Sequence, residues 1–277
     1  MPAVPLVSVV IPAYNNGRTL AETMRSVLTQ EGVDFELVVA DHSSTDDSAE
    51  IARSFEHDPR VTVLTTPSGG GAPRNWNRVT EAARGELLKL VCGDDVLRPG
   101  TLARQAAILA DPGVVLTACR RDVVDAGGRT IMADWGLRGL RRRMSGADAV
   151  RKAVRAGSNL FGEPASVMLR RAVLAETGGW FPEFPYLIDQ ASYTRVLMHG
   201  DFVPDTVTGA TFRMSSTQWS VALTRDQSSQ ARGYNHWIRE TYPGVLSRAD
   251  VLIGDARAWM MAHARRVSYA LLERRMR

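Results

Sequence analysis

The 277-residue chain has only two cysteines and lacks any apolar run long enough to cross a bilayer. Cys92 and Cys119 each lie in an apolar, strand-like stretch, which predicts buried free thiols rather than a disulfide or a metal pair. The opening residues, MPAVPLVSVVIP, carry no charged segment ahead of a strand pattern, so they do not resemble a signal peptide. With 44% hydrophobic and 23% charged residues, the sequence predicts a soluble globular protein with a cytoplasmic site of action.

Two common nucleotide-binding signatures are missing as well. The glycine-rich stretch from Ser68 to Gly71 lacks the Lys-Ser/Thr pair of a P-loop, and no G-x-G-x-x-G follows the first apolar run. The sequence therefore supports neither an ATPase nor a dinucleotide-dependent oxidoreductase. We also find no helix-turn-helix, zinc or base-stacking signature, which argues against a dedicated nucleic-acid-binding protein.

Positive charge is concentrated in two patches, although the whole chain has a net charge of only +4. Residues 138–155 carry a balance of +6, and residues 248–277 carry a balance of +4. Such patches indicate an anionic partner or surface at those places. The first patch is interpreted as a solvated face, or alternatively as a clamp for phosphates or an anionic acceptor. A nucleic acid, including a modified one that accepts a sugar, is a competing partner.

The pattern of apolar runs predicts alternating strands and helices. Buried strands are expected at Val7 to Ile11, Phe35 to Ala40 and Val61 to Leu64, and helical segments separate them. A further short strand is expected in the stretch Leu87 to Leu97, where the apolar run ends at Asp94-Asp95. This alternation predicts a mainly parallel sheet covered by helices on both faces. We expect three units, over residues 1–115, 116–245 and 246–277, the last of which is a basic amphipathic helix.

Polar side chains follow three of these strands where each strand ends. Tyr14, Asp41 and the pair Asp94-Asp95 should meet at one edge of the sheet, which is where open α/β sheets bind ligands. Two adjacent carboxylates need a counter-charge, and hard oxygen ligands without nearby His or Cys suit Mg²⁺ or Mn²⁺. A solvated turn is the alternative for the Asp pair, because Arg98-Pro99-Gly100 follows it.

Several motifs together resemble the inverting family 2 glycosyltransferases, which have the GT-A fold. The segments that carry the resemblance occur in order over about residues 5–220: SVVIPAYNNGRTL, FELVVADHSSTDDS, APRNWN, ARGELLKLVCGDD, GGWFPEF and FRMSS. The resemblance implies an α/β fold with a GT-A, Rossmann-like, mainly parallel sheet flanked by helices and with a C-terminal helical extension. It also implies a glycosyltransferase that uses a nucleoside-diphosphate sugar as donor and a hydroxyl group as acceptor. The unit over 1–115 would then be the half that binds the nucleotide sugar, and the unit over 116–245 the acceptor-binding and catalytic half.

On the donor side, the resemblance assigns Pro12, Ala13 and Tyr14 to the wall of the nucleobase pocket and places Asp41 near the base. An aromatic face can stack on a base, and a carboxylate can accept its N–H groups. The resemblance places Arg74 toward the nucleotide. The sequence departs from the family pattern at His42, where relatives often have Asp or Asn.

The resemblance also assigns the metal site. Asp95 is expected to hold Mn²⁺ or Mg²⁺, and Asp94 is expected to contact the ribose or the metal. Cys92 replaces the first Asp of the family motif D-x-D-D. Arg213 in FRMSS is expected to hold the diphosphate or to order its loop, and Met214 replaces a frequent His.

On the acceptor side, the resemblance makes Glu163 and Trp180 candidates for lining the sugar pocket, with a core position as the alternative for Trp180. Asp189 is the candidate catalytic base, because the acceptor hydroxyl must lose its proton as it attacks the anomeric carbon. A helix-capping role is the alternative for Asp189. A relative that binds nucleotide sugars without transferring them is a further alternative for the whole protein.

The C-terminal segment from Asp255 to Arg277 has the pattern of a basic amphipathic helix. Met260, Ala264, Val267 and Leu271 form one stripe, and Arg257, Arg265, Arg266, Arg274 and Arg275 lie mostly off it. We expect the stripe to pack on the domain. The alternative is peripheral contact with anionic lipid at the inner face of the membrane, which would suit a lipid-linked acceptor.

Overall fold

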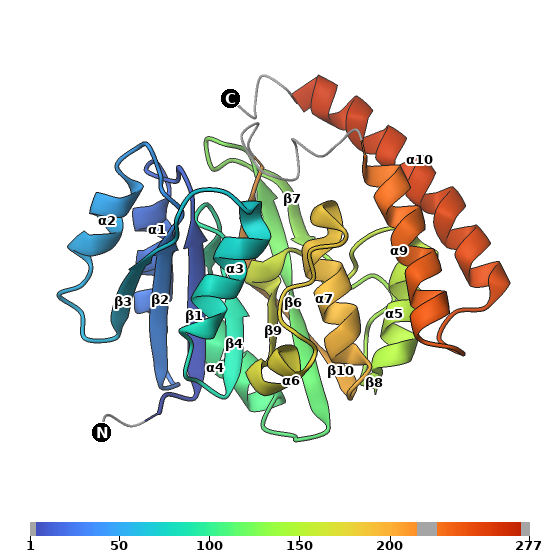
Figure 1. The fold of residues 1–277 in the computed structure, drawn as a ribbon, viewed down its shortest axis with the longest axis horizontal. Helices are drawn as coiled ribbons and strands as arrows, with labels where there is room; N and C mark the ends of the chain where they lie inside the picture. The colour runs from blue at the N-terminus through green and yellow to red at the C-terminus, as the bar shows by residue number, and fades with distance from the viewer. Residues whose placement is uncertain (1–3, 215–225, 273–277) are drawn as a thin grey trace.

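The computed structural model describes residues 4–214 and 226–272, with side chains described up to residue 264 in the last helix (Figure 1). The strands are β1 (Val7–Ala13), β2 (Phe35–Asp41), β3 (Val61–Thr65), β4 (Leu87–Leu90), β5 (Val96–Leu97), β6 (Val114–Val124), β7 (Thr130–Trp135), β8 (Met144–Ser145), β9 (Val167–Arg170) and β10 (Asp201–Arg213). The helices are α1 (Leu20–Leu28), α2 (Ser48–Ser54), α3 (Gly71–Glu81), α4 (Thr101–Ile108), α5 (Gly146–Ala156), α6 (Arg171–Glu176), α7 (Ile188–Leu197), α9 (Gln227–Thr241) and α10 (Arg248–Leu272), with 3-10 turns η1 (Pro164–Ser166) and η2 (Pro185–Leu187).

The strands form one sheet in the order β3-β2-β1-β4-β9-β6-β10-β5, with β7 on β6 and β8 on β10. Neighbours β3, β2, β1 and β4 pair in parallel, as do β6 and β10. The short strand β9 pairs antiparallel with both β4 and β6, so it joins the two parallel parts. The expected mainly parallel α/β sheet of the GT-A class is confirmed. Strands from both sides of residue 115 belong to this one sheet.

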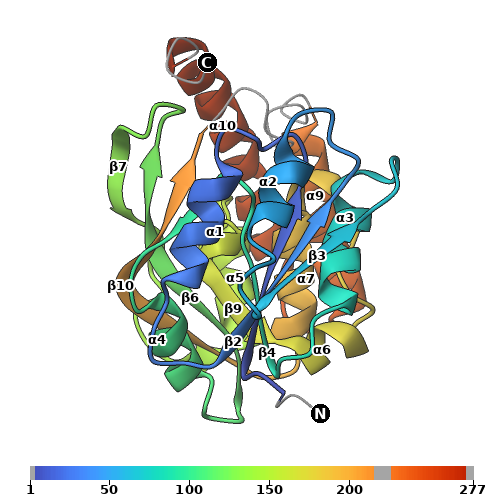
Figure 2. The same cartoon turned by 90° about the vertical axis from the view of Figure 1, so that its left-hand side faces the viewer.

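Helices cover both faces of the sheet. Helices α1 and α4 lie on one face, and α3 and α6 lie on the other (Figure 2). The strands β1 and β2 are buried along their whole length, because both faces are covered and their β-branched side chains pack on each side. In α1 the side chains of Leu20, Met24 and Val27 face the sheet, as the 3.6-residue spacing predicts.

Parallel register brings the carboxyl ends of three strands to the same level. Ala13 pairs with Asp41, and Asp41 pairs with Thr65. The buried Asn75 at the start of α3 fixes this edge: its Nδ2 donates to the carbonyls of Ala13 at 3.3 Å and Ala40 at 3.0 Å. The predicted convergence is therefore confirmed for the ends of β1 and β2, where Tyr14 and Asp41 lie.

Strand β4 contains a fully buried lysine, although its other residues are all apolar. Lys89 Nζ donates to Gln105 Oε1 at 2.7 Å and to the Val167 carbonyl at 3.3 Å. Burial lowers the pKa of this ammonium group to about 8. Lys89 thus ties together α4, β4 and β9 beneath the metal-motif residues.

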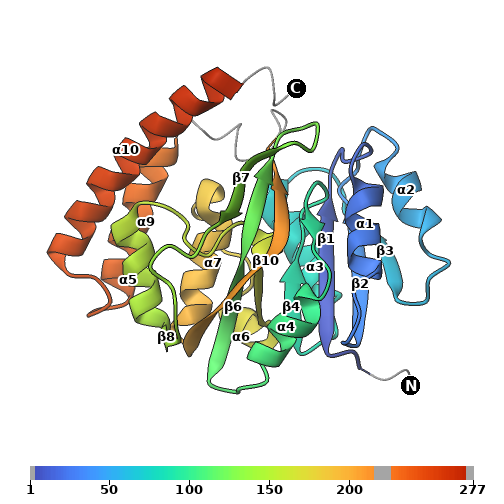
Figure 3. The same cartoon turned by 180° about the vertical axis from the view of Figure 1, so that it is seen from behind.

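The C-terminal helical extension is confirmed, but the expected packing of its stripe is wrong where the structure describes it. Helix α10 packs on α9 and α5 at the end of the sheet farthest from β3 (Figures 1 and 3). Its buried positions are Val251, Gly254, Ala258 and Ala262, because small side chains let the helices approach closely. Met260 and Ala264, which were expected to pack, are exposed. Val267 and Leu271, and the arginines from Arg265 onward, lie outside the described side chains.

No helix in the described ranges 4–214 and 226–272 combines the length and the hydropathy that crossing a membrane requires.

Candidate active site

The predicted nucleobase pocket lies beyond the ends of β1 and β2. Pro12 and Ala13 are buried at the end of β1, and Tyr14 follows with 59% of its surface exposed. Asp41 is 5% exposed, and its Oδ1 has no hydrogen-bond partner among the described residues. A buried carboxylate oxygen without a donor fits the N–H of a bound base.

His42, where the sequence departs from the family pattern, lies beside Asp41 and Tyr14. His42 is 7% exposed, and its Nε2 is 3.0 Å from the Gly69 carbonyl oxygen. Its ring lies 6.0 Å from that of Tyr14, at an interplanar angle of 60°. The imidazole therefore connects the glycine-rich loop to the exposed aromatic face on which a base could stack.

Arg74 lies in the first turn of α3, at the end of the glycine-rich loop. The side chain is exposed, and its Nη1 donates to the Ser68 carbonyl at 3.1 Å. This position leaves the guanidinium at the edge of the candidate donor pocket. Its contact with the nucleotide stays a prediction.

The carboxylates of the metal motif differ in burial. Asp95 is fully buried, and its Oδ1 accepts a hydrogen bond from the backbone N–H of Arg213 at 3.2 Å, whereas Asp94 is half-buried. Burial raises the pKa of Asp95 well above its usual range, and the neighbouring charge of Asp94 raises it further. A cation bound beside Asp95 would reverse this effect.

The residues present fit a divalent cation. In the described part of the chain, no group of three or more His, Cys, Asp and Glu side chains could enclose an ion. Asp95 Oδ2, however, is a buried oxygen that accepts no hydrogen bond from the residues described. Oxygen-only coordination by Asp95 and Asp94 suits a Mg²⁺ or Mn²⁺ ion that takes other ligands from phosphates and water.

The predicted diphosphate ligand Arg213 already has several protein contacts. Its Nε donates to the Asp94 carbonyl at 3.2 Å, and its Nη2 lies 2.8 Å from Glu22 Oε2. A third contact joins Nη1 to the Ala126 carbonyl at 3.3 Å. These bonds hold the segment with Asp94 and Asp95 against the end of β10. A direct contact of Arg213 with the diphosphate stays a prediction.

The candidate base Asp189 lies in the first turn of α7. It does not cap the helix, because the residue at the cap is Leu187 and no side chain caps this end. Asp189 Oδ2 accepts from Asn159 Nδ2 at 2.8 Å, and Oδ1 accepts from the Gln190 N–H at 2.7 Å. Burial raises the pKa of Asp189 to about 7, against the effect of these hydrogen bonds. A carboxylate with this pKa is suited to take a proton near neutral pH.

Glu163 stands beside Asp189 and is held by an arginine that the sequence did not single out. Arg121 Nη2 donates to Glu163 Oε1 at 3.0 Å, and Arg121 Nε forms an ion pair with Oε2. Arg121 is 5% exposed, so this is a largely buried two-point pair. The negative charge of Glu163 raises the pKa of Asp189. Glu163 is thus a carboxylate of fixed position that can accept hydrogen bonds beside Asp189.

Cys92 lies between the donor-side and acceptor-side carboxylates. Burial raises the pKa of its thiol well above the usual range, and the charges of Asp95, Asp94, Asp189 and Glu163 raise it further, in that order. The four carboxylates therefore lie close enough to this thiol for their charges to act on it. The structure therefore brings together the predicted metal, base and acceptor residues around one point.

Trp180 lies in the core, which is the alternative to its expected role in the sugar pocket. The side chain is 2% exposed, and its Nε1 donates to Thr80 Oγ1 at 2.8 Å. Its ring packs edge-on against Trp76, with 5.0 Å between centroids, and lies 6.3 Å from the Tyr193 ring. An indole with so little exposed surface does not line an open pocket.

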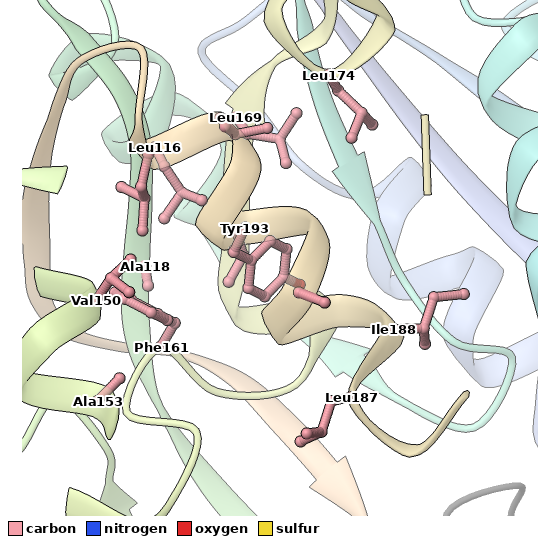
Figure 4. Close-up of a cluster of buried hydrophobic side chains, with 14 of the residues drawn as sticks. Leu116, Ala118, Val150, Ala153, Phe161, Leu169, Leu174, Leu187, Ile188 and Tyr193 are labelled. Atoms are coloured by element: carbon pink, nitrogen blue, oxygen red, sulfur yellow. The ribbon is translucent and has the colours of Figure 1, made fainter. Parts of the chain in front are cut away.

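The apolar cluster around Tyr193 fixes the orientation of α7. Figure 4 shows the Tyr193 ring among Leu116, Leu169 and Ile188, with Leu187 at the start of the same helix. Because Tyr193 is one turn after Asp189, packing of the ring fixes the direction of the carboxylate.

Arg121 and Asn159 are the site residues that the sequence analysis missed. Asn159 Oδ1 also accepts from the N–H groups of Phe161 and Gly162, so its amide closes the turn before Glu163. The only local signal is an Asn-x-x-Gly turn pattern, which is common in loops. The partners of both residues are distant in sequence.

Comparisons with known proteins show the family to which the chain belongs. The profile of the family described as Glycosyl transferase family 2 matches residues 8–178. An uncharacterised protein of Mycobacterium tuberculosis is 38% identical over 211 residues, which are 73% of this chain and 66% of that protein. The glycosyltransferase GlyG of Streptococcus pneumoniae is 38% identical over 94 residues, which are 34% of this chain and 31% of GlyG. The chain thus spans less than two thirds of these relatives.

Solved structures share the fold. TarS 1–349 of S. aureus in complex with UDP-GlcNAc superposes with a TM-score of 0.69 at 18% identity, over 88% of this chain and 69% of that one. The mannosyltransferase PcManGT of Pyrobaculum calidifontis, in complex with GDP-Man and Mn²⁺, gives 0.63 at 19% identity, over 98% and 76%. The family match covers more than half of the chain and includes β1 to β9, with the metal motif and Glu163. The chain belongs to glycosyltransferase family 2 and has the GT-A fold of a glycosyltransferase.

Proposed function

We propose that the protein is a metal-dependent, inverting glycosyltransferase that moves a sugar from a nucleoside-diphosphate donor to an acceptor hydroxyl. The observation that carries the proposal is that Asp95, which adjoins Asp94 and is held by the Arg213 N–H, and Asp189, which is held by Asn159, both lie near Cys92. Asp94 and Asp95 would act on the side of the leaving diphosphate, and Asp189 would act on the attacking hydroxyl group. The complexes of TarS with UDP-GlcNAc and of PcManGT with GDP-Man support the class of donor.

On the donor side, the base would stack on Tyr14, and Asp41 Oδ1 would accept one of its N–H groups. Asp95, assisted by Asp94, would hold Mn²⁺ or Mg²⁺. When bound, such an ion neutralises negative charge that develops on the departing diphosphate. Arg213 holds the Asp95 carboxylate through its backbone N–H and holds the backbone of Asp94 through its guanidinium group.

On the acceptor side, Asp189 takes the proton of the attacking hydroxyl. The new bond forms between the acceptor oxygen and the anomeric carbon as the bond from that carbon to the phosphate oxygen breaks. The nucleoside diphosphate leaves with the bonding electrons. Attack from the face opposite the leaving group inverts the anomeric configuration, and Glu163 would accept hydrogen bonds from acceptor hydroxyls.

Calorimetry with the common nucleoside diphosphates and their sugars, with and without Mn²⁺, tests the donor site. We expect binding that requires the ion and selects one nucleotide. Asp95→Asn should abolish that binding, whereas Asp189→Asn should retain it and lose transfer. Asp148→Asn, at an exposed carboxylate of α5, is the matched control and should change neither. Absence of binding to every nucleotide would contradict the proposal.

A further inference from the structure

The outer face of α10 exposes large apolar side chains to solvent. Leu252 is 71% exposed, Trp259 is 57% exposed and Met260 is 59% exposed. With the exposed Ala256 they occupy positions spaced by three or four residues, so they share one side of the helix. This side is turned away from Val251 and Ala258, which pack on the domain.

Among the described side chains of α10, this face carries the positive charge of Arg248 and no carboxylate. Both acidic residues of the described part of α10 turn toward neighbouring helices: Asp250 binds Arg155 of α5 at 2.6 Å, and Asp255 binds Asn235 of α9 at 2.9 Å. Arg248 and His263 are exposed. Segment 248–277 as a whole has a charge balance of +4. An apolar stripe flanked by basic groups is complementary to an anionic lipid surface.

The placement of the helix is consistent with this partner. The Trp259 ring lies against that of His263, with 4.1 Å between centroids and an interplanar angle of 41°, so the indole lies along the surface of the helix. Such an amphipathic ring is favoured at the boundary between lipid and water. The C-terminal end of α10 lies at the same end of the molecule as the carboxyl ends of β1 and β2 (Figures 1 and 3). A membrane contacted by α10 would therefore adjoin the side on which the candidate active site lies.

We propose that the outer face of α10, defined by Leu252, Ala256, Trp259 and Met260, binds the surface of a membrane that contains anionic phospholipids. The helix lies in the interface with its apolar side chains among the lipid head groups and does not cross the bilayer. This proposal concerns where the protein works and is independent of the reaction that it catalyses.

Flotation of the purified protein with lipid vesicles tests the proposal. We expect binding to phosphatidylcholine vesicles that contain phosphatidylglycerol, weaker binding to phosphatidylcholine alone, and weaker binding as salt is raised. Leu252→Ser and Trp259→Ser should each reduce the partition coefficient about tenfold, because each removes a large apolar side chain from the interface. Val4→Ser is the matched control, since Val4 is also 71% exposed but lies near the N-terminus.

Fluorescence supplies a second readout. Brominated lipids should quench the wild type more strongly than the Trp259→Phe variant, because only a tryptophan in the interface meets the bromine atoms. Equal quenching, or vesicle binding that both serine variants retain, would overturn the proposal. The proposal would also be overturned if the wild-type protein did not bind the vesicles. Loss of a dimer or of binding to duplex DNA in Leu252→Ser would then identify the partner of this face instead. Transfer to a water-soluble acceptor should be unchanged in these variants, which separates this test from that of the proposed function.

Discussion

Replacing Asp189 by Asn should abolish transfer and at the same time stabilise the protein above neutral pH. The pKa of Asp189 rises from its ordinary value of 3.8 to about 7 in the fold, because burial disfavours the charged form. At about 1.4 kcal/mol per pKa unit, keeping this group ionised costs about 4 kcal/mol of folding free energy above pH 7. The carboxyl is mostly neutral in both folded and unfolded chains at low pH. The cost therefore develops as pH rises from about 4 to 7.

An amide at this position is neutral at every pH, but it has one acceptor oxygen where the carboxylate has two. One of the hydrogen bonds from Asn159 and Gln190 is then lost, at about 1 to 2 kcal/mol. The net gain should be about 2 kcal/mol at pH 8, which corresponds to a rise in Tm of about 5 °C. At pH 4 the gain should disappear or change sign.

Thermal unfolding of wild type and Asp189→Asn, followed by circular dichroism across this pH range, measures the difference directly. Transfer is followed in parallel as release of nucleoside diphosphate, and it should fall about a hundredfold or more because the general base is lost. The reasoning is refuted if the variant transfers at the parental rate. It is also refuted if the stability difference between the two proteins does not change with pH.

Three further changes test the surroundings of the base. Asn159→Ala removes a hydrogen bond to the ionised carboxylate of Asp189, so the acidic limb of the pH profile of kcat/KM should move to higher pH. The value of kcat should fall about tenfold. An acidic limb that does not move would argue against a positioning role for Asn159. Arg121→Ala leaves Glu163 without its counter-charge and should lower the unfolding free energy by about 3 kcal/mol, whereas Arg121→Lys should recover only part of the loss in denaturant unfolding. Trp180→Phe breaks the hydrogen bond to Thr80 and should cost about 1 kcal/mol of stability in the same assay, with the KM for acceptor unchanged; a raised KM would instead place the indole in the acceptor pocket.

The donor half of the site could be predicted from sequence because its information is local. Each strand is a β-branched run that stops at a polar residue, and parallel pairing then forces Tyr14 and Asp41 to one edge. The same reasoning placed Asp94 and Asp95 after β4. Such predictions need only the period of the pattern and the geometry of a parallel sheet.

The acceptor half depends on contacts between distant segments. Arg121 meets Glu163 across 42 positions, and Asn159 meets Asp189 across 30, so no local pattern identifies either partner. Trp180 could be assigned to the core only after Trp76 and Tyr193 were placed around it. Pairings of this kind are set by the tertiary fold.

Helix α10 shows a second reason why a prediction from sequence can fail. Its sequence pattern predicted an amphipathic helix, which is confirmed, but the stripe with Met260 was assigned to the wrong side. The helix packs through Gly254, Ala258 and Ala262 instead. Periodicity shows that a helix has two kinds of face, whereas the neighbouring helices α5 and α9 decide which face they cover.

The position of Cys92 has a consequence for the chemical durability of the enzyme. Peroxides and alkylating reagents attack the thiolate, whereas burial, together with the charges of the four nearby carboxylates, raises the pKa of this thiol and keeps it protonated at physiological pH. The second cysteine, Cys119, is fully buried in β6, where burial also raises its pKa. The protein thus has a cysteine at the centre of its site and should still keep its activity in air, without added reductant.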